Sequence, residues 1–242
     1  MATIGSMTTS TLPGSTPIRG ISSMATRQLL ADLVPAFEQR CGAPVVIESV
    51  GGVDAARRVL AGEAFDVVVL ASDALQKLVA AGRVVADSVV DLVHSGVAVA
   101  VQAGAPQPGI GSEDAVRQAV LAAPTLSYST GPSGVALAAL FERWGIAEAV
   151  RSRIVQAPPG VPVGTLVARG DVALGFQQLS ELLHVQGITV LGPLPPEIQI
   201  TTTFSAGVCA NAAQSEAARA LIAFMASSEA ADAKRRQGMD PA

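Results

Sequence analysis

Short apolar runs alternate with segments of helical periodicity from residue 18 onward. Residues 65–70 form an apolar run of strand length, interrupted only by Asp66, as expected for a strand buried on both faces of a sheet. Residues 25–41 instead repeat their large apolar side chains at helical spacing. This alternation predicts a parallel sheet with helices on both sides and right-handed crossovers. We expect strands at residues 18–22, 44–49 and 65–70, and helices at residues 25–41, 53–61 and 73–81.

Two long β-rich stretches, residues 90–103 and 198–210, bracket a second α/β block. A chain that leaves one α/β lobe, builds another and returns makes two lobes joined by two crossover strands. The cleft between the lobes is then the default ligand site. We expect lobe 1 at residues 18–95 plus 203–242 and lobe 2 at residues 96–202. Within and after the block we expect helices at residues 112–123, 133–144, 163–169, 215–226 and 228–237, and strands at residues 125–129, 153–157, 172–177 and 188–191.

The composition excludes several classes of protein. Half of the 242 residues are hydrophobic and 15% are charged, against about 25% charged in typical soluble domains. Such an aliphatic chain argues against disorder. A net charge of −4 with 3% aromatic residues argues against nucleic-acid binding, which needs basic and stacking groups. The apolar runs are all far shorter than the ~20 residues of a membrane span, so no membrane span is expected.

The N-terminal residues 1–17 are rich in Ser, Thr, Gly and Pro and lack the apolar segment of a secretory signal. We expect them to be disordered and partly vector-derived, with a native start at Met7. If Met7 is the native start, we expect a cytoplasmic protein; if a signal peptide was removed, we expect a periplasmic one. Cys41 and Cys209 are expected to be buried, unpaired thiols.

Hydroxyls, glycines and amides recur where the expected strands end, and fixed charges are rare there. Ligands of such sheets lie beyond the carboxyl ends of the strands, at helix N-termini. We therefore expect a small oxyanion or carboxylate held by neutral donors, with no metal and no cofactor. The alternative is that these serines are ordinary helix N-caps and the glycines ordinary turn residues. The candidate ligand-binding residues are Ser22, Ser23, Gly51, Gly52, Val53, Ser72, Ser133, Gly134, Val161, Val163, Gln177 and Gln178.

Catalytic motifs are weak in this sequence. It has no metal-ligand spacing of Cys and His, no nucleophile elbow and no phosphate-binding loop followed by Lys. His94 and His184 are interpreted as structural, and Arg57 and Arg58 as a solvated helix face. The candidate proton carriers near the expected cleft are Asp54, Asp73, Glu181 and Tyr128.

Several motifs resemble the type II periplasmic-binding-protein fold, in the branch of the molybdate-binding proteins of ABC transporters. They are I-S-S-M-A from Ile21, A-G-E-A-F-D-V-V-V-L from Ala61, L-V-A-A-G from Leu78 and V-A-R-G-D-V-A-L-G-F-Q-Q from Val167. The resemblance covers residue 18 to the C-terminus. It implies two lobes that close on an oxyanion held by serine hydroxyls and backbone amides.

The resemblance also assigns positions in that binding site. Ser23 matches the serine after the first strand, and Ser133 and Val163 lie in segments that supply backbone amides. Val53 lies near a second serine of the family, and Gln178 lies where the molybdate binders have tyrosine. These two departures weaken the expectation of molybdate itself.

The later motifs are similar to a sub-branch that includes aconitate isomerase: G-F-Q-Q-L-S-E-L-L from Gly175, G-P-L-P from Gly192 and F-S-A-G from Phe204. Two functions are therefore expected. The first is a substrate-binding protein, which would deliver its anion to an ABC-transporter permease if it is exported. The alternative is an isomerase that shifts a double bond in a di- or tricarboxylic acid, its general base being unidentified. Fold analogy alone does not choose between them.

Overall fold

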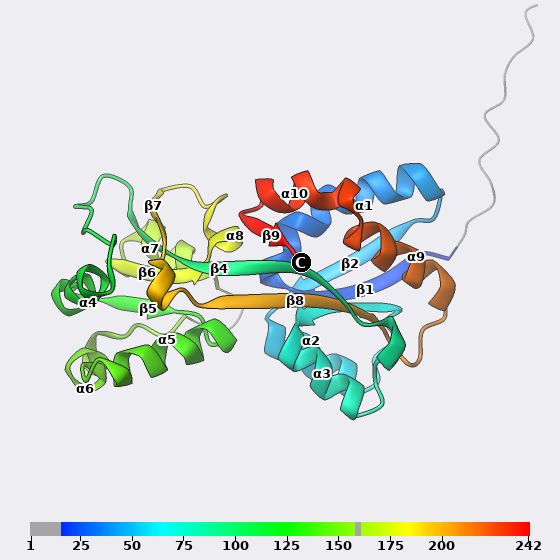
Figure 1. Cartoon of the computed structure of the whole chain (residues 1–242), viewed down its shortest axis with the longest axis horizontal. Coiled ribbons are helices and arrows are strands. Elements are labelled where there is room, and N and C mark those ends of the chain that lie inside the picture. Colours follow the sequence, from blue (N-terminus) through cyan, green and yellow to red (C-terminus); the bar gives the residue numbers. More distant parts are fainter. Residues whose placement is uncertain (1–15, 158–160) are drawn as a thin grey trace, which may run out of the picture.

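The apolar runs form strands, and the amphipathic segments form helices, close to where periodicity places them. The computed structural model describes residues 16–157 and 161–242. The expectation about the N-terminal segment therefore lies outside the described residues up to residue 15. Helices and strands alternate as expected, and together they form two α/β lobes (Figure 1).

Lobe 1 is built on a parallel three-stranded core in which β1 lies between β2 and β3. Strand β3 is fully buried because its alternate side chains enter two different clusters. Val67 and Val69 pack with helices α1, α9 and α10, whereas Val68 and Leu70 pack with α2 and α3 on the other face. The elements are β1 (Ile18–Ser23), β2 (Val45–Val50), β3 (Val67–Ala71), α1 (Arg27–Cys41), α2 (Gly52–Leu60), α3 (Ser72–Ala80), α9 (Ser215–Ala226) and α10 (Ala231–Arg236).

Lobe 2 repeats this layered arrangement with shorter elements. Val97, Val99 and Val101 pack with α4, α5 and α6 on one face, whereas Ala98 and Ala100 face the side covered by α7 and α8. The elements are α4 (Glu113–Ala122), β5 (Leu126–Tyr128), α5 (Pro132–Arg143), α6 (Ala147–Val150), α7 (Val163–Arg169), β6 (Leu174–Gln178), α8 (Leu179–Leu182) and β7 (Ile188–Pro193).

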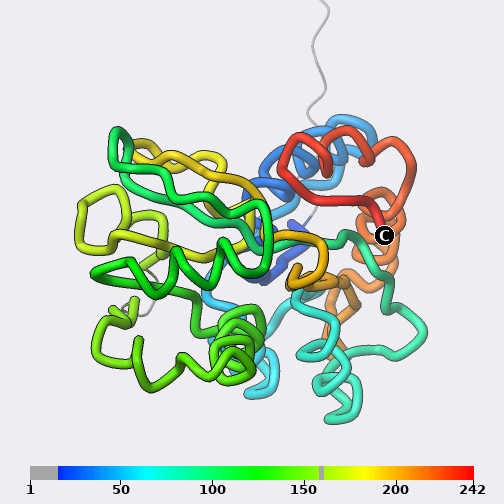
Figure 2. The backbone as a smooth tube through the Cα atoms, turned by 60° about the vertical axis from the view of Figure 1, so that its left-hand side comes forward, coloured from blue at the N-terminus to red at the C-terminus, as the bar shows by residue number. Residues whose placement is uncertain are grey.

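Two long strands, β4 (Val90–Gln102) and β8 (Thr201–Val208), run from one lobe into the other (Figures 1 and 2). They pair antiparallel with each other, and β8 also pairs antiparallel with β3. The order β2-β1-β3-β8-β4-β6-β5 therefore combines parallel pairs inside each lobe with antiparallel crossovers. The lobe 1 core reaches Val93 on β4, and the lobe 2 core begins at Val97. The hydrophobic core to which β4 contributes thus changes between Val93 and Val97. This supports our proposal that the boundaries between the lobes lie between residues 95 and 96 and between residues 202 and 203.

The structure differs from the sequence expectations in a few short segments. Residues 153–157 form no strand but only one bridge, from Ile154 to Leu126. Arg153 instead donates hydrogen bonds to the carbonyls of Leu121 and Ala123 at the end of α4. Cys41 is exposed rather than buried, whereas Cys209 is buried, and both thiols are free. Elements too short to show periodicity were not expected: α6, α8, β9 (Met239–Pro241), η2 (Ala86–Ser88), η3 (Arg151–Arg153) and η4 (Pro196–Ile198). The helix expected at residues 228–237 is formed by η5 (Ser228–Ala230) and α10, and the helix expected from residue 25 begins within η1 (Met24–Thr26).

Candidate functional site

A cavity of about 580 Å³ lies between the two lobes. Its lobe 1 wall comes from the ends of β1 and β3 and the starts of α2 and α3. Its lobe 2 wall comes from the loop before α5, the segment before α7, and the end of β6 with α8. Nine of the twelve candidate ligand-binding residues line it: Ser23, Gly51, Gly52, Val53, Ser133, Val161, Val163, Gln177 and Gln178.

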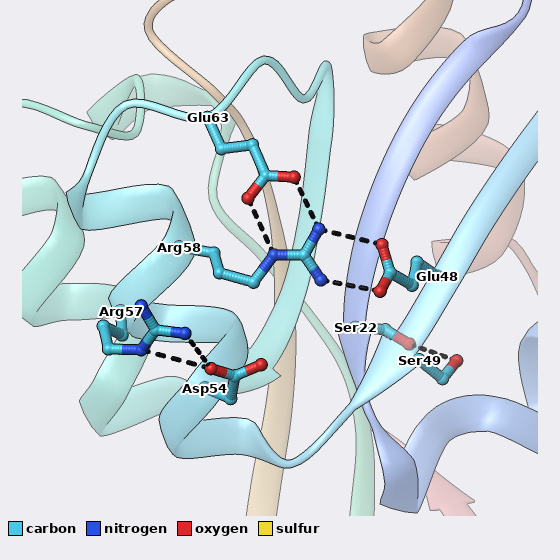
Figure 3. Close-up of polar contacts among 7 residues, drawn as sticks. All are labelled: Ser22, Glu48, Ser49, Asp54, Arg57, Arg58 and Glu63. Carbon is cyan, nitrogen blue, oxygen red and sulfur yellow. Dashed lines mark hydrogen bonds and ion pairs between the residues drawn. The ribbon is translucent and has the colours of Figure 1, made fainter.

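The other three candidates, Ser22, Ser72 and Gly134, are not among the residues that line this cavity. The Ser22 hydroxyl pairs with Ser49 Oγ at 2.8 Å, which ties β1 to β2 (Figure 3). Ser72 donates to the carbonyl of Thr203 at 3.2 Å, tying α3 to β8. Gly134 is a packing position, since a Cβ there would lie 1.6 Å from the carbonyl oxygen of Ser129.

Ser23 lines the cavity and carries a buried hydroxyl. Among the residues that the structure describes, Ser23 Oγ and Ser127 Oγ are the buried side-chain polar atoms without a hydrogen-bond partner. Ser23 precedes η1 but makes no capping bond to it, whereas Ser112 accepts from the backbone N–H of Ala115 as a normal N-cap of α4. A buried unmade hydrogen bond costs about 1–3 kcal/mol. The cap interpretation therefore holds for Ser112 and not for Ser23.

Helices α2, α3 and α5 begin at the cavity without a side-chain cap. Helix α2 starts after Gly51, and helix α5 starts after Gly131. The first N–H groups of a helix have no acceptor within it and carry a partial positive charge. Gly52, at the start of α2, lies beside Ser23, because a Cβ built on it would be 3.6 Å from the Ser23 Cβ. The lobe 1 wall thus combines a free hydroxyl with a helix N-terminus, which suits a carboxylate or oxyanion.

Lobe 2 presents hydroxyl and amide groups that already form some hydrogen bonds within the protein. Ser133 Oγ lies 3.0 Å from Ser129 Oγ, so one of the two hydroxyls retains a free hydrogen for a ligand. The side-chain amide of Gln178 meets Thr202 Oγ1 at 2.9 Å across the crossover strands. Thr202 lies on β8 and also lines the cavity; sequence reasoning missed it because no strand end or helix start marks its position.

Glu181 places a carboxyl group in the wall of the same cavity. Its Oε1 accepts a hydrogen bond of 2.9 Å from Gln177 Nε2, and Gln177 Oε1 accepts one of 3.1 Å from the backbone N–H of Gly164. The side chain is partly exposed because it opens into the cavity. Desolvation by the surrounding protein raises the pKa of Glu181 to about 7, an effect partly offset by the hydrogen bond from Gln177. The carboxyl can therefore exchange a proton near neutral pH.

Basic side chains reach the cavity at its rim on lobe 1. Arg57 and Lys77 both line it and are exposed. Arg57 is paired with Asp54 one helical turn away (Figure 3). Arg58 points elsewhere, donating to Glu48 and Glu63, so its role is structural, tying β2 to α2 and the turn after it (Figure 3).

The two histidines lie outside this cavity wall. His94 Nδ1 lies 2.9 Å from Thr203 Oγ1, and His184 Nε2 lies 2.6 Å from Gln237 Oε1. Among the described residues, no group of three or more His, Cys, Asp or Glu is arranged to hold a metal ion. Within the same residues, no helix is long and apolar enough to cross a membrane.

Comparison with known proteins agrees with this two-lobed arrangement. The family model described as bacterial extracellular solute-binding protein matches residues 18–240. A curated relative named aconitate isomerase, from Pseudomonas sp., is 38% identical over 232 residues, covering 93% of this chain and 88% of the relative.

Two solved structures share the fold at low sequence identity. The periplasmic molybdate-binding protein of Azotobacter vinelandii superposes with a TM-score of 0.77 at 19% identity, over 92% of this chain and 98% of that one. The sulfate-binding protein of Mycobacterium tuberculosis also gives a TM-score of 0.77 at 19% identity, over 94% of this chain and 87% of that one. The family match spans almost the whole described chain, and both solved structures share its fold. This chain therefore belongs to the bacterial extracellular solute-binding protein family.

Proposed function

We propose that this protein binds a small di- or tricarboxylic acid between its lobes and shifts the double bond of that acid, a reaction of the aconitate isomerase type. The observation that carries the proposal is the unpartnered hydroxyl of Ser23, buried in the cavity wall beside the uncapped start of α2. The uncapped start of α5 lies on the opposite lobe and lines the same cavity. Anion-binding groups on separate walls suit a ligand with more than one carboxylate.

The size of the cavity supports an organic ligand. Its volume of about 580 Å³ falls in the range of ~300–1,000 Å³ that is usual for organic ligands. A single oxyanion of four oxygens fills only a few times the ~30 Å³ of a water molecule. Lys77 at the rim offers a positive charge to a further carboxylate, whereas Arg57 is already paired with Asp54. A tricarboxylate therefore uses the available groups more fully than molybdate or sulfate does.

The relative named aconitate isomerase supports the same choice. Its similarity extends over most of both chains, so it includes both walls of the cavity. The solved oxyanion-binding proteins support the fold alone, because their identity to this chain is 19%.

A ligand panel followed by a turnover assay tests the proposal. Thermal shifts would be measured with molybdate, tungstate, sulfate, citrate, cis-aconitate and trans-aconitate, and with tricarballylate, a saturated tricarboxylate. Proton NMR would then follow either aconitate isomer in the presence of the protein. We expect stabilisation by tricarboxylates and conversion of one aconitate isomer into the other. Stabilisation by molybdate alone, without turnover, would refute the isomerase.

The second candidate function is a receptor that closes on its anion without chemistry and passes it to an ABC-transporter permease. The family match and the two-lobed cleft favour it. Tight binding of one anion, with no change in that anion after prolonged incubation, is the result expected of such a receptor.

A further inference from the structure

We propose that Glu181 is the acid–base group that carries the proton during the double-bond shift, held in place by Gln177. This inference rests on the proposed function and deepens it, because it names the residue that would perform the chemistry. Glu181 lies on α8, directly after β6, and lines the cavity between the lobes.

A chain of hydrogen bonds fixes the direction of the Glu181 carboxyl. The backbone N–H of Gly164 donates to Gln177 Oε1, so the Gln177 amide must present its NH₂ group to the other side. That NH₂ group donates to Glu181 Oε1. The second carboxyl oxygen has no role in this chain and remains available to a ligand. Gln177 is therefore a positioning residue for Glu181.

The short helix that carries Glu181 is also tied to the ligand-binding loop of the other lobe. Ser180 Oγ donates a hydrogen bond of 2.9 Å to the carbonyl of Ala25, which lies two residues after Ser23. Both Ser180 and Ala25 are buried. Glu181 is consequently held near the loop that offers the unpartnered Ser23 hydroxyl, so the same ligand can meet both groups.

The structure separates Glu181 from the other three candidate proton carriers. Asp54 does not line the cavity and is paired with Arg57. Asp73 lines the cavity but is exposed on the first turn of α3. Tyr128 does not line the cavity, and burial raises the pKa of its phenol above an already high ordinary value. Glu181 alone among these four combines a place in the cavity wall with a fixing hydrogen bond.

The proposed step is a proton shift between two carbons of one substrate. The Glu181 carboxylate removes a proton from the methylene carbon, and the electron pair of that C–H bond spreads over the allylic system and its carboxylates. The protonated Glu181 then returns the proton to the former vinylic carbon, so the double bond moves by one position. Nothing is oxidised or reduced. The Ser23 hydroxyl and the helix N-termini stabilise the negative charge that develops on the carboxylates.

The charged surroundings of Glu181 are compatible with this role. The elements packed against α8 are β4, β6, β7 and η1. Their ionisable side chains are Asp91, which accepts from Ser205, and His94, which bonds to Thr203. Asp73, Arg57 and Lys77 face the same cavity from lobe 1. Burial is the largest cause that raises the pKa of Glu181 to about 7, close to the value that suits a group that both takes and gives a proton at neutral pH.

Glu181→Gln tests the inference because it keeps the shape and the bond from Gln177 while removing the basic group. Wild type and variant would be incubated with cis-aconitate in D₂O, and NMR would follow both isomerisation and exchange of the methylene protons. We expect the rates of isomerisation and of proton exchange to be about 10²–10⁴-fold lower in the variant. Its affinity for tricarballylate, measured by calorimetry, should be unchanged. Glu142→Gln, an exposed change on α5, is the matched control and should keep both rates.

The outcomes separate the inference from the proposed function. If wild type isomerises aconitate and Glu181→Gln does so equally well, the inference fails and the function stands. If wild type neither isomerises nor exchanges any unsaturated polycarboxylate, the function fails and the inference falls with it. Should Glu181→Gln fail to fold, the pH dependence of wild-type kcat/KM decides: an ionisation near pH 7 with an active basic form supports Glu181, and its absence overturns the assignment.

Discussion

Replacing Ser23 by alanine should weaken ligand binding without destabilising the free protein. The hydroxyl is buried, lines the cavity and has no partner within the part of the chain that the structure describes. In the free protein its hydrogen-bonding capacity is unmet, so its removal costs no bond. In the complex it is expected to donate to a carboxylate, and that bond is lost in Ser23→Ala.

The magnitude follows from the charge of the acceptor. A hydrogen bond to a charged group contributes about 1.5–3 kcal/mol, which corresponds to a rise in Kd of about 10- to 150-fold. In the free protein, removal of an unmet buried hydroxyl leaves the free energy of unfolding unchanged or raises it by up to about 1 kcal/mol. For a chain of this length that is a Tm change of roughly 0 to +4 °C.

Calorimetric titration with tricarballylate and thermal melts of the free proteins measure the two effects. Ser127→Ala is the matched control, because Ser127 Oγ is equally buried and unpartnered but is not part of the cavity wall. It should leave Kd unchanged and alter Tm in the same direction as Ser23→Ala. A fall in the Tm of free Ser23→Ala by several degrees, or equal loss of affinity in both variants, would refute the reasoning.

Three further predictions address other parts of the molecule. Burial disfavours the ionised form of Glu181 in the folded state, so its folded pKa of about 7 lies above the ordinary glutamate value of 4.5. The free energy of unfolding should therefore fall by up to about 3 kcal/mol between pH 4.5 and pH 7, and denaturant melts of Glu181→Gln should lack this loss. Gly134→Ala should lower Tm by several degrees in a thermal melt, because the new Cβ meets the Ser129 carbonyl, whereas Gly111→Ala, with nothing within 4 Å, should not. Lys77→Gln should raise Kd for tricarballylate a few-fold at low salt and have little effect at high salt, because an exposed charge is screened.

The periodicity of the sequence predicted most of the long elements, because the apolar residues that they bury recur at a regular spacing along the chain. Strand β3 reads as a continuous apolar run because both of its faces are covered, and α1 reads as a helix because Leu29, Leu33 and Phe37 share its buried face. Short elements escaped prediction. Helix α8 has four residues, which is too few for a periodic pattern, although it carries the residue to which we assign the chemistry.

The candidate site was predictable where it follows strand ends and not elsewhere. Ser23 ends β1, Gly52 follows β2, and both line the cavity. Ser72 also follows a strand, but its hydroxyl bonds to the backbone of β8, a partner 131 residues away that no local pattern reveals. Thr202 lies in the cavity wall because two crossover strands meet there, and its sequence neighbourhood gave no sign of this.

The sequence by itself determined the two α/β lobes, the crossover strands and the neutral, hydroxyl-rich strand ends, because these depend on local periodicity and on turn chemistry. Only the tertiary structure decided which hydroxyls form hydrogen bonds within the protein and which have no partner there and remain free for a ligand. It also decided that Glu181 becomes an ionisable group poised near neutral pH, because desolvation depends on atoms brought together from distant parts of the chain. Net charge and residue type follow directly from the sequence. The hydrogen bonding and the pKa values of the cavity residues instead depend on how the two lobes enclose the cavity.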